Sequence, residues 1–198
     1  MTESRISLYL ALVHHPVLNR KGEIISSAIT NLDLHDMGRL ACTYGIPACY
    51  IVTPLLDQQA LAHRLIQHWC DGIGKVLHPD RERALRRLCI VDDVAAVIRD
   101  IQEQWGRRPV VWATTAHERS DAITARRARK FLATGEVPCL LLLGTGWGLA
   151  PMALADVDGV VKGICGTNGY NHLSVRCAAA ILVDRLLARG EDDRGLEI

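Results

Sequence analysis

The stretch PCLLLLGTGWGLAPM, residues 138–152, decides the fold class of this chain. It starts as a short, continuous apolar run, which is typical of a strand buried on both faces in a parallel sheet. The run then breaks into glycines at every second position, Gly144, Gly146 and Gly148. Glycine lets a backbone approach a ligand more closely than any side chain would permit. The stretch therefore predicts a strand that ends in a ligand-binding turn.

Short apolar strands and amphipathic helices alternate along the rest of the chain. This alternation predicts an α/β fold: a single domain, residues 1–198, with a mostly parallel sheet of about six strands flanked by helices. The acidic tail at about residues 190–198 is expected to fray. Besides 138–144, we expect strands at 6–13, 48–53, 109–116 and 159–165, and helices at 26–45, 57–72, 94–106, 124–135 and 172–190.

The composition is that of a soluble globular protein, with 49% hydrophobic and 23% charged residues. The apolar stretch near the N-terminus is too short for a signal peptide, and it lacks a small-residue cleavage site. No apolar run approaches the roughly 20 residues that a membrane-spanning helix needs. We therefore expect a cytoplasmic protein that does not enter a membrane.

The seven cysteines are scattered and include no C-x-x-C pair, which argues against a disulfide framework and against a zinc cluster. Most lie next to Leu, Ile or Ala, a context that favours small apolar core residues. His14 and His15 end the first expected strand, where substrate groups can lie. No third ligand accompanies them at metal spacing, so we expect no metal site.

Two clusters of basic residues stand out on a chain whose formal net charge is only +1. Such clusters are either solvated helix faces or parts of a phosphate-binding surface, and both interpretations stay open. The first cluster holds Arg81, Arg83, Arg86 and Arg87, and the second holds Arg119, Arg126, Arg127, Arg129 and Lys130.

The glycine pattern excludes several nucleotide-binding loops. A dinucleotide fingerprint, G-x-G-x-x-G, would place its third glycine at Leu149 or Pro151, and no Gly-Lys-Ser/Thr of a Walker loop follows. The sequence GTGWG does spell the G-x-G-x-G of Rossmann-type methyltransferases. Those enzymes carry this loop after their first strand, however, and too few residues follow Gly144 in the 198-residue chain for six further strands.

Three segments, in the expected order, resemble the SPOUT superfamily of knotted RNA methyltransferases. The first, NLDLHDMGRLACTYGIPACYIVTP (31–54), is similar to a motif in which an Arg follows an Asn by six residues. Arg39 matches this Arg, whereas Asp33 stands where the Asn is common and His35 replaces a frequent Gly. The second segment, LLLLGTGWGLAPM (140–152), is similar to the strand and glycine pattern whose backbone wraps the cofactor.

The third segment, GICGTNGYNHLSVRCAAAI (163–181), is similar to a loop and helix start that commonly read Ser-Leu-Asn-Val-Ser-x-Ala. Here His172, Ser174 and Arg176 replace the first Ser, the Asn and the second Ser. These departures indicate a distinct branch. The segment resembles a small bacterial family of RNA methyltransferases, occasionally fused to a guanine-N1 tRNA methyltransferase.

The resemblance implies a C-terminal deep trefoil knot, in which the end of the chain is threaded through a loop. It also implies S-adenosyl-L-methionine as the cofactor and an RNA substrate, either tRNA or rRNA. A homodimer is expected as well, because the acceptor site in this superfamily usually forms between two subunits. The apolar first and last helices, around residues 37–44 and 175–187, offer the surface for it, although they can also simply cover the sheet.

The resemblance assigns two sets of site residues. Arg39, with Asp33 and Asp36 nearby, is expected on the acceptor side of the reaction, where a positioned cation or base assists methyl transfer. One or more of the acidic residues can instead cap the helix, as Ser174 can cap the last one. The expected cofactor-binding residues are Thr114, Thr115, Leu143, Gly144, Gly146, Trp147, Gly148, Leu149, Gly163, Ile164, Asn168, His172, Leu173 and Ser174.

Two other functions stay open at this point. The chain can be a knotted RNA- or cofactor-binding module without catalysis, because Asp33 and Ser174 depart from the motifs. It can also be a Rossmann-type enzyme that acts on a small molecule. The leading prediction remains an S-adenosylmethionine-dependent RNA methyltransferase.

Overall fold

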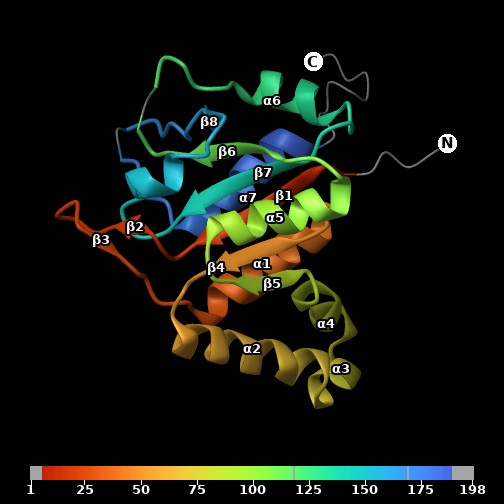
Figure 1. Cartoon of the computed structure of the whole chain (residues 1–198). Coiled ribbons are helices and arrows are strands. Elements are labelled where there is room, and N and C mark those ends of the chain that lie inside the picture. Colours follow the sequence, from red (N-terminus) through yellow and green to blue (C-terminus); the bar gives the residue numbers. More distant parts are fainter. Residues whose placement is uncertain (1–5, 118, 169, 189–198) are drawn as a thin grey trace.

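The computed structural model describes residues 6–117, 119–168 and 170–188. Its main sheet has six strands in the order β5-β4-β1-β7-β6-β8, and every neighbouring pair is parallel (Figure 1). The predicted α/β class and parallel sheet are confirmed. The strands are β1 (Leu8–Val13), β4 (Cys49–Val52), β5 (Leu88–Val91), β6 (Val110–Thr114), β7 (Cys139–Gly144) and β8 (Gly159–Val161).

Helices cover the two faces of the sheet unequally. One face packs against α1 (Asn31–Thr43), α2 (Leu56–Cys70), α4 (Pro79–Leu85), α6 (Ala125–Leu132) and α7 (Val175–Leu187), and α3 (Ile73–Leu77) lies between α2 and α4. The other face packs against α5 (Val94–Trp105) and the 3-10 turn η1 (Pro151–Leu154). In β1, Leu8, Leu10 and Leu12 join the first core and Tyr9, Ala11 and Val13 the second; all are fully buried.

The strand order reverses direction at the centre of the sheet. From β1 the chain moves outward to β4 and β5, and it then returns on the other side of β1 with β6, β7 and β8. In open parallel sheets, ligands bind outside the carboxyl ends of the strands at such a switch point. The carboxyl ends of β1 and β7, which pair along their whole length, mark this place.

Several predicted boundaries are confirmed. The first helix is followed by Gly45, whose φ of +66° is the left-handed conformation expected after a helix. Ser174 caps α7, because its side chain accepts a hydrogen bond from the backbone N of Cys177. The strand expected at 159–165 is shorter than predicted, since the chain turns against the segment after β6: the N of Lys162 donates to Ile123 O over 2.9 Å.

The short helices α3 and α4, the edge strand β5 and a small hairpin after β1 were not anticipated from the sequence. The edge strand β5 has four residues and is only partly buried, so its hydrophobic pattern is weak. A small antiparallel hairpin, β2 (Val17–Leu18) and β3 (Ile24–Ile25), projects from the carboxyl end of the sheet directly after β1 (Figure 1). Strands of two residues have no periodicity that a sequence pattern can reveal.

The cysteines divide by exposure. Cys49, Cys70 and Cys139 are buried in the core as predicted, whereas the core prediction is wrong for the exposed Cys165 and Cys177. None of the seven forms a disulfide in the described part of the chain. No described helix is long and apolar enough to cross a membrane. The predicted acidic tail lies outside the described residues.

Candidate functional site

Three loops meet at the carboxyl end of the sheet. They are the glycine loop (residues 144–150, at the end of β7), the β6 loop (115–117) and the final loop (described residues 162–168 and 170–174, after β8). Asn171 Nδ2 in the final loop donates to Ala116 O in the β6 loop over 2.6 Å. The ring centroids of Trp147 and His172 lie 5.7 Å apart and join the glycine loop to the final loop. The structure therefore brings together segments that the sequence motifs assigned separately.

The three glycines of the glycine loop lie in different surroundings. A Cβ on Gly144 would lie 2.7 Å from the backbone N of Leu149, so the loop folds back onto its own strand. Gly146 has a φ of +57°, and a Cβ there would lie 2.7 Å from Leu18 O. Gly148 has a φ of +104°, but nothing lies within 4 Å of its Cβ position. The close approaches at the first two glycines are thus to the protein's own backbone, and only the third faces open space.

The hairpin holds the glycine loop in place. The N of Trp147 donates to Leu18 O over 2.8 Å, and the N of Leu18 donates to Gly148 O over 2.9 Å. The N of Ala150 donates to Pro16 O over 3.1 Å. These bonds run in the antiparallel sense, and they fix the glycine loop as a rigid wall of the site.

The open part of the site lies between the β6 loop and the final loop. A cavity of about 520 Å³ there is lined by Ala116 and Arg119 on one side and by Gly163, Ile164 and Asn171 on the other. Its volume is within the range of pockets that hold small-molecule cofactors. Gly163 is needed for the closeness of the two loops, because a Cβ on it would lie 2.6 Å from Thr115 O.

The other expected cofactor residues fall into two groups. Some serve the fold: Leu143 and Leu149 are buried, and Thr114 Oγ1 donates to Leu142 O over 3.0 Å. Thr115 Oγ1 accepts from the N of His117, and Asn168 Oδ1 accepts from the N of Tyr170. The side chains of Trp147, His172 and Leu173 are instead exposed around the three loops.

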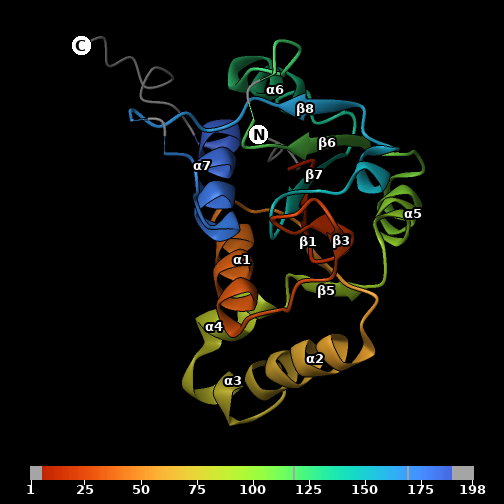
Figure 2. The same ribbon diagram turned by 90° about the vertical axis from the view of Figure 1, so that its left-hand side faces the viewer.

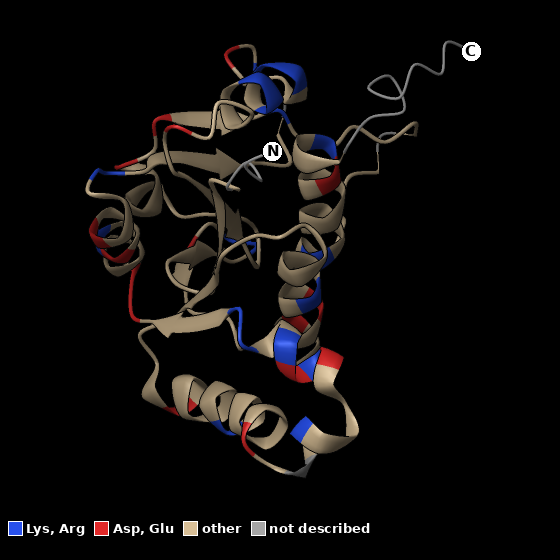
Figure 3. Cartoon of the chain, turned by 90° about the vertical axis from the view of Figure 1, so that its right-hand side faces the viewer, with Lys and Arg blue, Asp and Glu red and all other residues tan. Residues whose placement is uncertain are grey.

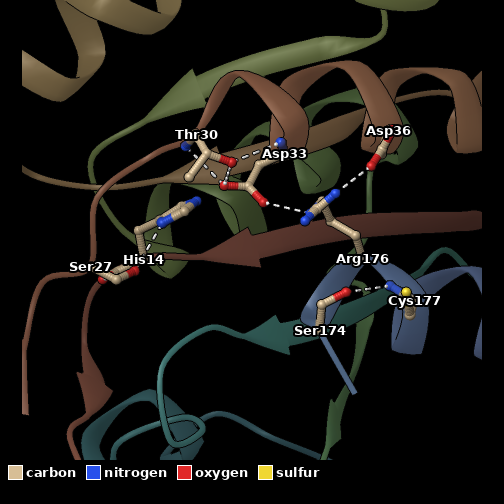
Figure 4. Close-up of polar contacts among 8 residues, drawn as sticks. All are labelled: His14, Ser27, Thr30, Asp33, Asp36, Ser174, Arg176 and Cys177. Carbon is tan, nitrogen blue, oxygen red and sulfur yellow. Dashed lines mark hydrogen bonds and ion pairs between the residues drawn. The ribbon is translucent and has the colours of Figure 1, made fainter. Parts of the chain in front are cut away.

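The expected acceptor-side carboxylates are held by an arginine that the motif interpretation did not select (Figure 4). Asp33 forms a capping box with Thr30 at the start of α1, which confirms its capping role. Its Oδ1 also lies 3.3 Å from Nε of Arg176 on α7, whose Nη1 donates to Asp36 Oδ2 over 2.6 Å. Both Asp33 and Arg176 depart from the family motifs. Their opposite charges are the feature of the sequence that indicates an ion pair between them.

Arg39 lies on the exposed face of α1, one turn beyond Asp36, and no hydrogen bond or ion pair joins it to another described residue. Helices α1 and α7 lie side by side (Figure 2). Besides the Arg176 pairs, Tyr44 Oη donates to Asp184 Oδ1 over 2.6 Å. Arg39 therefore projects from a fixed two-helix surface with its guanidinium available.

The end of β1 carries a buried polar network. His14 is 1% exposed, and its Nδ1 lies 2.9 Å from Ser27 Oγ, which lies 2.5 Å from Thr145 Oγ1 of the glycine loop. Burial lowers the pKa of His14 below its ordinary value of 6.5. His14 thus ties β1 to the glycine loop and is closed to substrate. Within the described residues, no group of three or more His, Cys, Asp or Glu side chains is arranged to hold a metal ion.

The two basic clusters differ in how many of their side chains contact other residues of the chain. In the first, Arg86 pairs with Glu82, Arg87 donates to the carbonyls of Ile46 and Pro47, and Arg81 stacks on Trp69. Most of the second cluster lies on α6 (Figure 3). There Arg119 pairs with Asp121 and Arg129 donates to Ala188 O, whereas Arg126, Arg127 and Lys130 are exposed.

Comparison with known proteins identifies the family. A family model described as SAM-dependent RNA methyltransferase matches residues 7–188. The chain belongs to this family. It is 47% identical over 181 residues to a tRNA (guanine-N(1)-)-methyltransferase of Oleidesulfovibrio alaskensis, a match that covers 91% of the chain but only 42% of that relative. A protein of Aquifex aeolicus is 33% identical over 187 residues, which is 94% of the chain and 91% of the relative.

Solved structures share the fold at low sequence identity. A probable methyltransferase from Bordetella pertussis superposes with a TM-score of 0.59 at 16% identity, over 94% of the chain and 97% of that protein. The SpoU methyltransferase AviRb of Streptomyces viridochromogenes, in complex with AdoMet, superposes with a TM-score of 0.54 at 12% identity, over 96% of the chain and 58% of that protein. The predicted function, an S-adenosylmethionine-dependent RNA methyltransferase with a SPOUT-like fold, is confirmed.

Proposed function

We propose that this methyltransferase acts on tRNA and that the three loops hold its S-adenosylmethionine. The observation that carries the tRNA assignment is the match to a longer relative named as a tRNA methyltransferase. The chain spans only 42% of that relative, so the guanine-N1 chemistry in its name is not assigned to this chain. A domain joined to a tRNA-modifying unit meets the same RNA, which favours tRNA over rRNA as the substrate.

The cofactor in this proposal occupies the cavity between the β6 loop and the more open final loop, with the rigid glycine loop beside the final loop. S-adenosylmethionine carries no phosphates, so it needs backbone groups that read the adenine and apolar walls around the bent chain. The exposed side chain of Leu173 and the cavity-lining Ile164 offer such walls, and Gly163 allows the close backbone approach. When bound, the cofactor supplies an activated methyl group.

Arg39 is the acceptor-side residue in this proposal. Methyl transfer gains from a cation that is positioned before charge develops on the acceptor. Arg39 is exposed on α1, and Arg176 occupies the nearby carboxylates of Asp33 and Asp36, which leaves the Arg39 guanidinium free for the RNA. Asp33 and Asp36 then act by fixing α1 against α7.

A homodimer built on α1 and α7 completes the acceptor site in this proposal. Leu32 at the start of α1 is 56% exposed and Leu173 just before α7 is 46% exposed, so both side chains are available to a second copy. Arg39 lies on this two-helix surface. A second copy that covers the leucines brings one subunit's Arg39 towards the partner's loops. A monomeric mass in light scattering at micromolar protein would contradict the dimer.

The trefoil knot is also part of the proposal. Ile123 runs parallel to Val161 of β8 on the outer side of the sheet, so the chain after β6 wraps around β8. The final loop then passes along the inside of this wrap, where Gly163 contacts Thr115 and Asn171 contacts Ala116. Threading of the final loop through residues 115–124 fits these contacts.

The test is transfer of labelled methyl groups from S-adenosylmethionine into unmodified RNA transcripts. We expect incorporation into one or more tRNA transcripts and none into rRNA fragments, and digestion with mass spectrometry then identifies the methylated nucleoside. Calorimetric titration with the cofactor runs in parallel. Incorporation into rRNA alone would overturn the tRNA assignment, and cofactor binding without transfer to either RNA would indicate a binding module.

A further inference from the structure

The hairpin β2–β3 is a feature that neither the cofactor nor the acceptor assignment uses. Its tip, residues 19–23, projects into solvent at the carboxyl end of the sheet (Figure 1). Yet the tip is well ordered by its own hydrogen bonds. Asn19 Oδ1 accepts from the N of Lys21 over 2.8 Å and from the N of Glu23 over 3.0 Å, and the N of Gly22 donates to Asn19 O over 3.0 Å. A turn that is fixed in this way presents its side chains at little entropic cost.

The fixed turn presents two cations. Arg20 and Lys21 occupy the two central positions of the turn, both are exposed, and neither forms an ion pair with another described residue. The neighbouring carboxylate of Glu23 is engaged instead by Asn19 Nδ2 over 2.7 Å. The tip therefore holds two cations at a defined place, neither of them in an ion pair with a described residue, beside the single carboxylate of Glu23.

The hairpin that carries these cations is hydrogen-bonded to the glycine loop at Trp147, whose ring is exposed. Leu18 O, two residues before Arg20, accepts the hydrogen bond from the N of Trp147. The side chain of Trp147 is 54% exposed. The ring centroid of His172 lies 5.7 Å from that of Trp147 and 5.5 Å from that of Tyr170, so the aromatic surface continues over all three rings. Cations beside exposed aromatic rings are the combination that binds single-stranded nucleic acid, because phosphates pair with the cations and bases stack on the rings.

We propose that the hairpin tip and Trp147 form an RNA-binding clamp, in which Arg20 and Lys21 hold phosphates next to the target nucleotide and an unstacked base packs on Trp147. This inference rests on the proposed tRNA substrate. The hydrogen bonds between residues 16–18 and the glycine loop give the clamp a direct mechanical link to the cofactor loops. RNA held by the tip is thereby held in register with the methyl donor.

The test compares two double variants in binding a fluorescently labelled, unmodified tRNA transcript by anisotropy. Arg20→Ala/Lys21→Ala should weaken binding about tenfold and lower the slope of log affinity against log salt by about 1.4 to 1.8. Its methyl-transfer rate at subsaturating RNA should fall by a similar factor, whereas its cofactor affinity should not change. The control, Arg64→Ala/Lys75→Ala, removes an exposed Arg and an exposed Lys from α2 and α3. It should leave the tRNA affinity and its salt slope unchanged.

Trp147 is tested separately. Trp147→Ala should weaken tRNA binding about fivefold or more, whereas Trp147→Phe keeps an aromatic face and should restore most of it. Loss of cofactor affinity in Trp147→Ala, with RNA affinity unchanged, would overturn the stacking role. Unchanged tRNA affinity and salt slope in the Arg20/Lys21 variant, with methyl transfer intact, would overturn the clamp alone. No tRNA binding or methylation by the unaltered protein would overturn the clamp together with the proposed substrate.

Discussion

The glycine loop and the final loop lie next to each other at the same end of the sheet, but they are held in different ways. Backbone hydrogen bonds to residues 13 and 16–18 fix the glycine loop, and two of its glycines, Gly144 and Gly146, fit against the protein's own backbone. Most of the final loop is exposed, and a side-chain bond from Asn171 joins it to the β6 loop. The glycine loop is therefore a part of the folded core, whereas the final loop is the side of the site that can adapt to a ligand.

The largest effect is expected at the point where the glycine loop meets the hairpin. Gly146→Val forces a β-branched side chain to a φ of +57° and to within 2.7 Å of Leu18 O. We expect the free energy of unfolding to fall by roughly 3–5 kcal/mol, with loss of cofactor binding as a consequence. Urea unfolding measures the first quantity and calorimetric titration the second.

The matched control is Gly106→Val. Gly106 has a similar φ of +69°, but nothing lies within 4 Å of its Cβ position and it ends α5, away from the three loops. It should lose only about 1–3 kcal/mol, the cost of the strained backbone. Equal losses in the two variants would show that the contact with the hairpin is unimportant and that the glycine loop is not the rigid wall described above.

Arg39 tests the acceptor side, which neither loop provides. Arg39→Ala should lower the maximal rate of methyl transfer by roughly 10²-fold and leave cofactor affinity within a few-fold. Arg39→Lys should recover only part of the rate, because an ammonium does not reproduce the planar guanidinium. Arg99→Ala, an exposed arginine on α5, serves as the control. If cofactor affinity and stability fell together in Arg39→Ala, the residue would be structural.

The sequence predicted most of the fold because strand burial and helix periodicity carry strong signals. The first five residues of β7, for example, are all apolar and all buried in the core. The hairpin was not predicted because two-residue strands have no hydrophobic periodicity, and its turn residues 19–23 are ordinary surface residues. Most of the expected cofactor residues also lie on the three loops that the structure brings together, and their role in cofactor binding stays a prediction. They did not select Arg176, because its role depends on Asp33, a residue 140 or so positions away that only the packing of α1 on α7 brings near.

A smaller effect is expected in the final loop. Asn171→Ala removes the bond to Ala116 O, and a single hydrogen bond contributes about 0.5–1.5 kcal/mol. Cofactor affinity should therefore fall about 3- to 10-fold, while the midpoint of thermal unfolding stays close to that of the unaltered protein. Gln67→Ala, which removes an exposed amide on α2, is the control. A large loss of stability in Asn171→Ala would remove the distinction between the two loops.

The smallest effect concerns pH and returns to the rigid side of the site. Burial lowers the pKa of His14 in the folded protein below its ordinary value of 6.5. Below pH 6.5 the unfolded chain therefore binds a proton that the folded chain does not, so the contribution of His14 to stability is present above that pH and is lost as the pH falls. The pH-dependent loss between pH 7.5 and 5.5 should be smaller in His14→Gln than in the unaltered protein. His63→Gln, which changes an exposed histidine on α2, should behave like the unaltered protein.

Urea unfolding at the two pH values measures these differences in stability. Since Ser27 links His14 to Thr145, the same loss should appear in hydrogen exchange of the glycine loop but not of the final loop. Parallel pH dependence in His14→Gln and in the unaltered protein would mean that the imidazole is not what makes the rigid loop sensitive to acid.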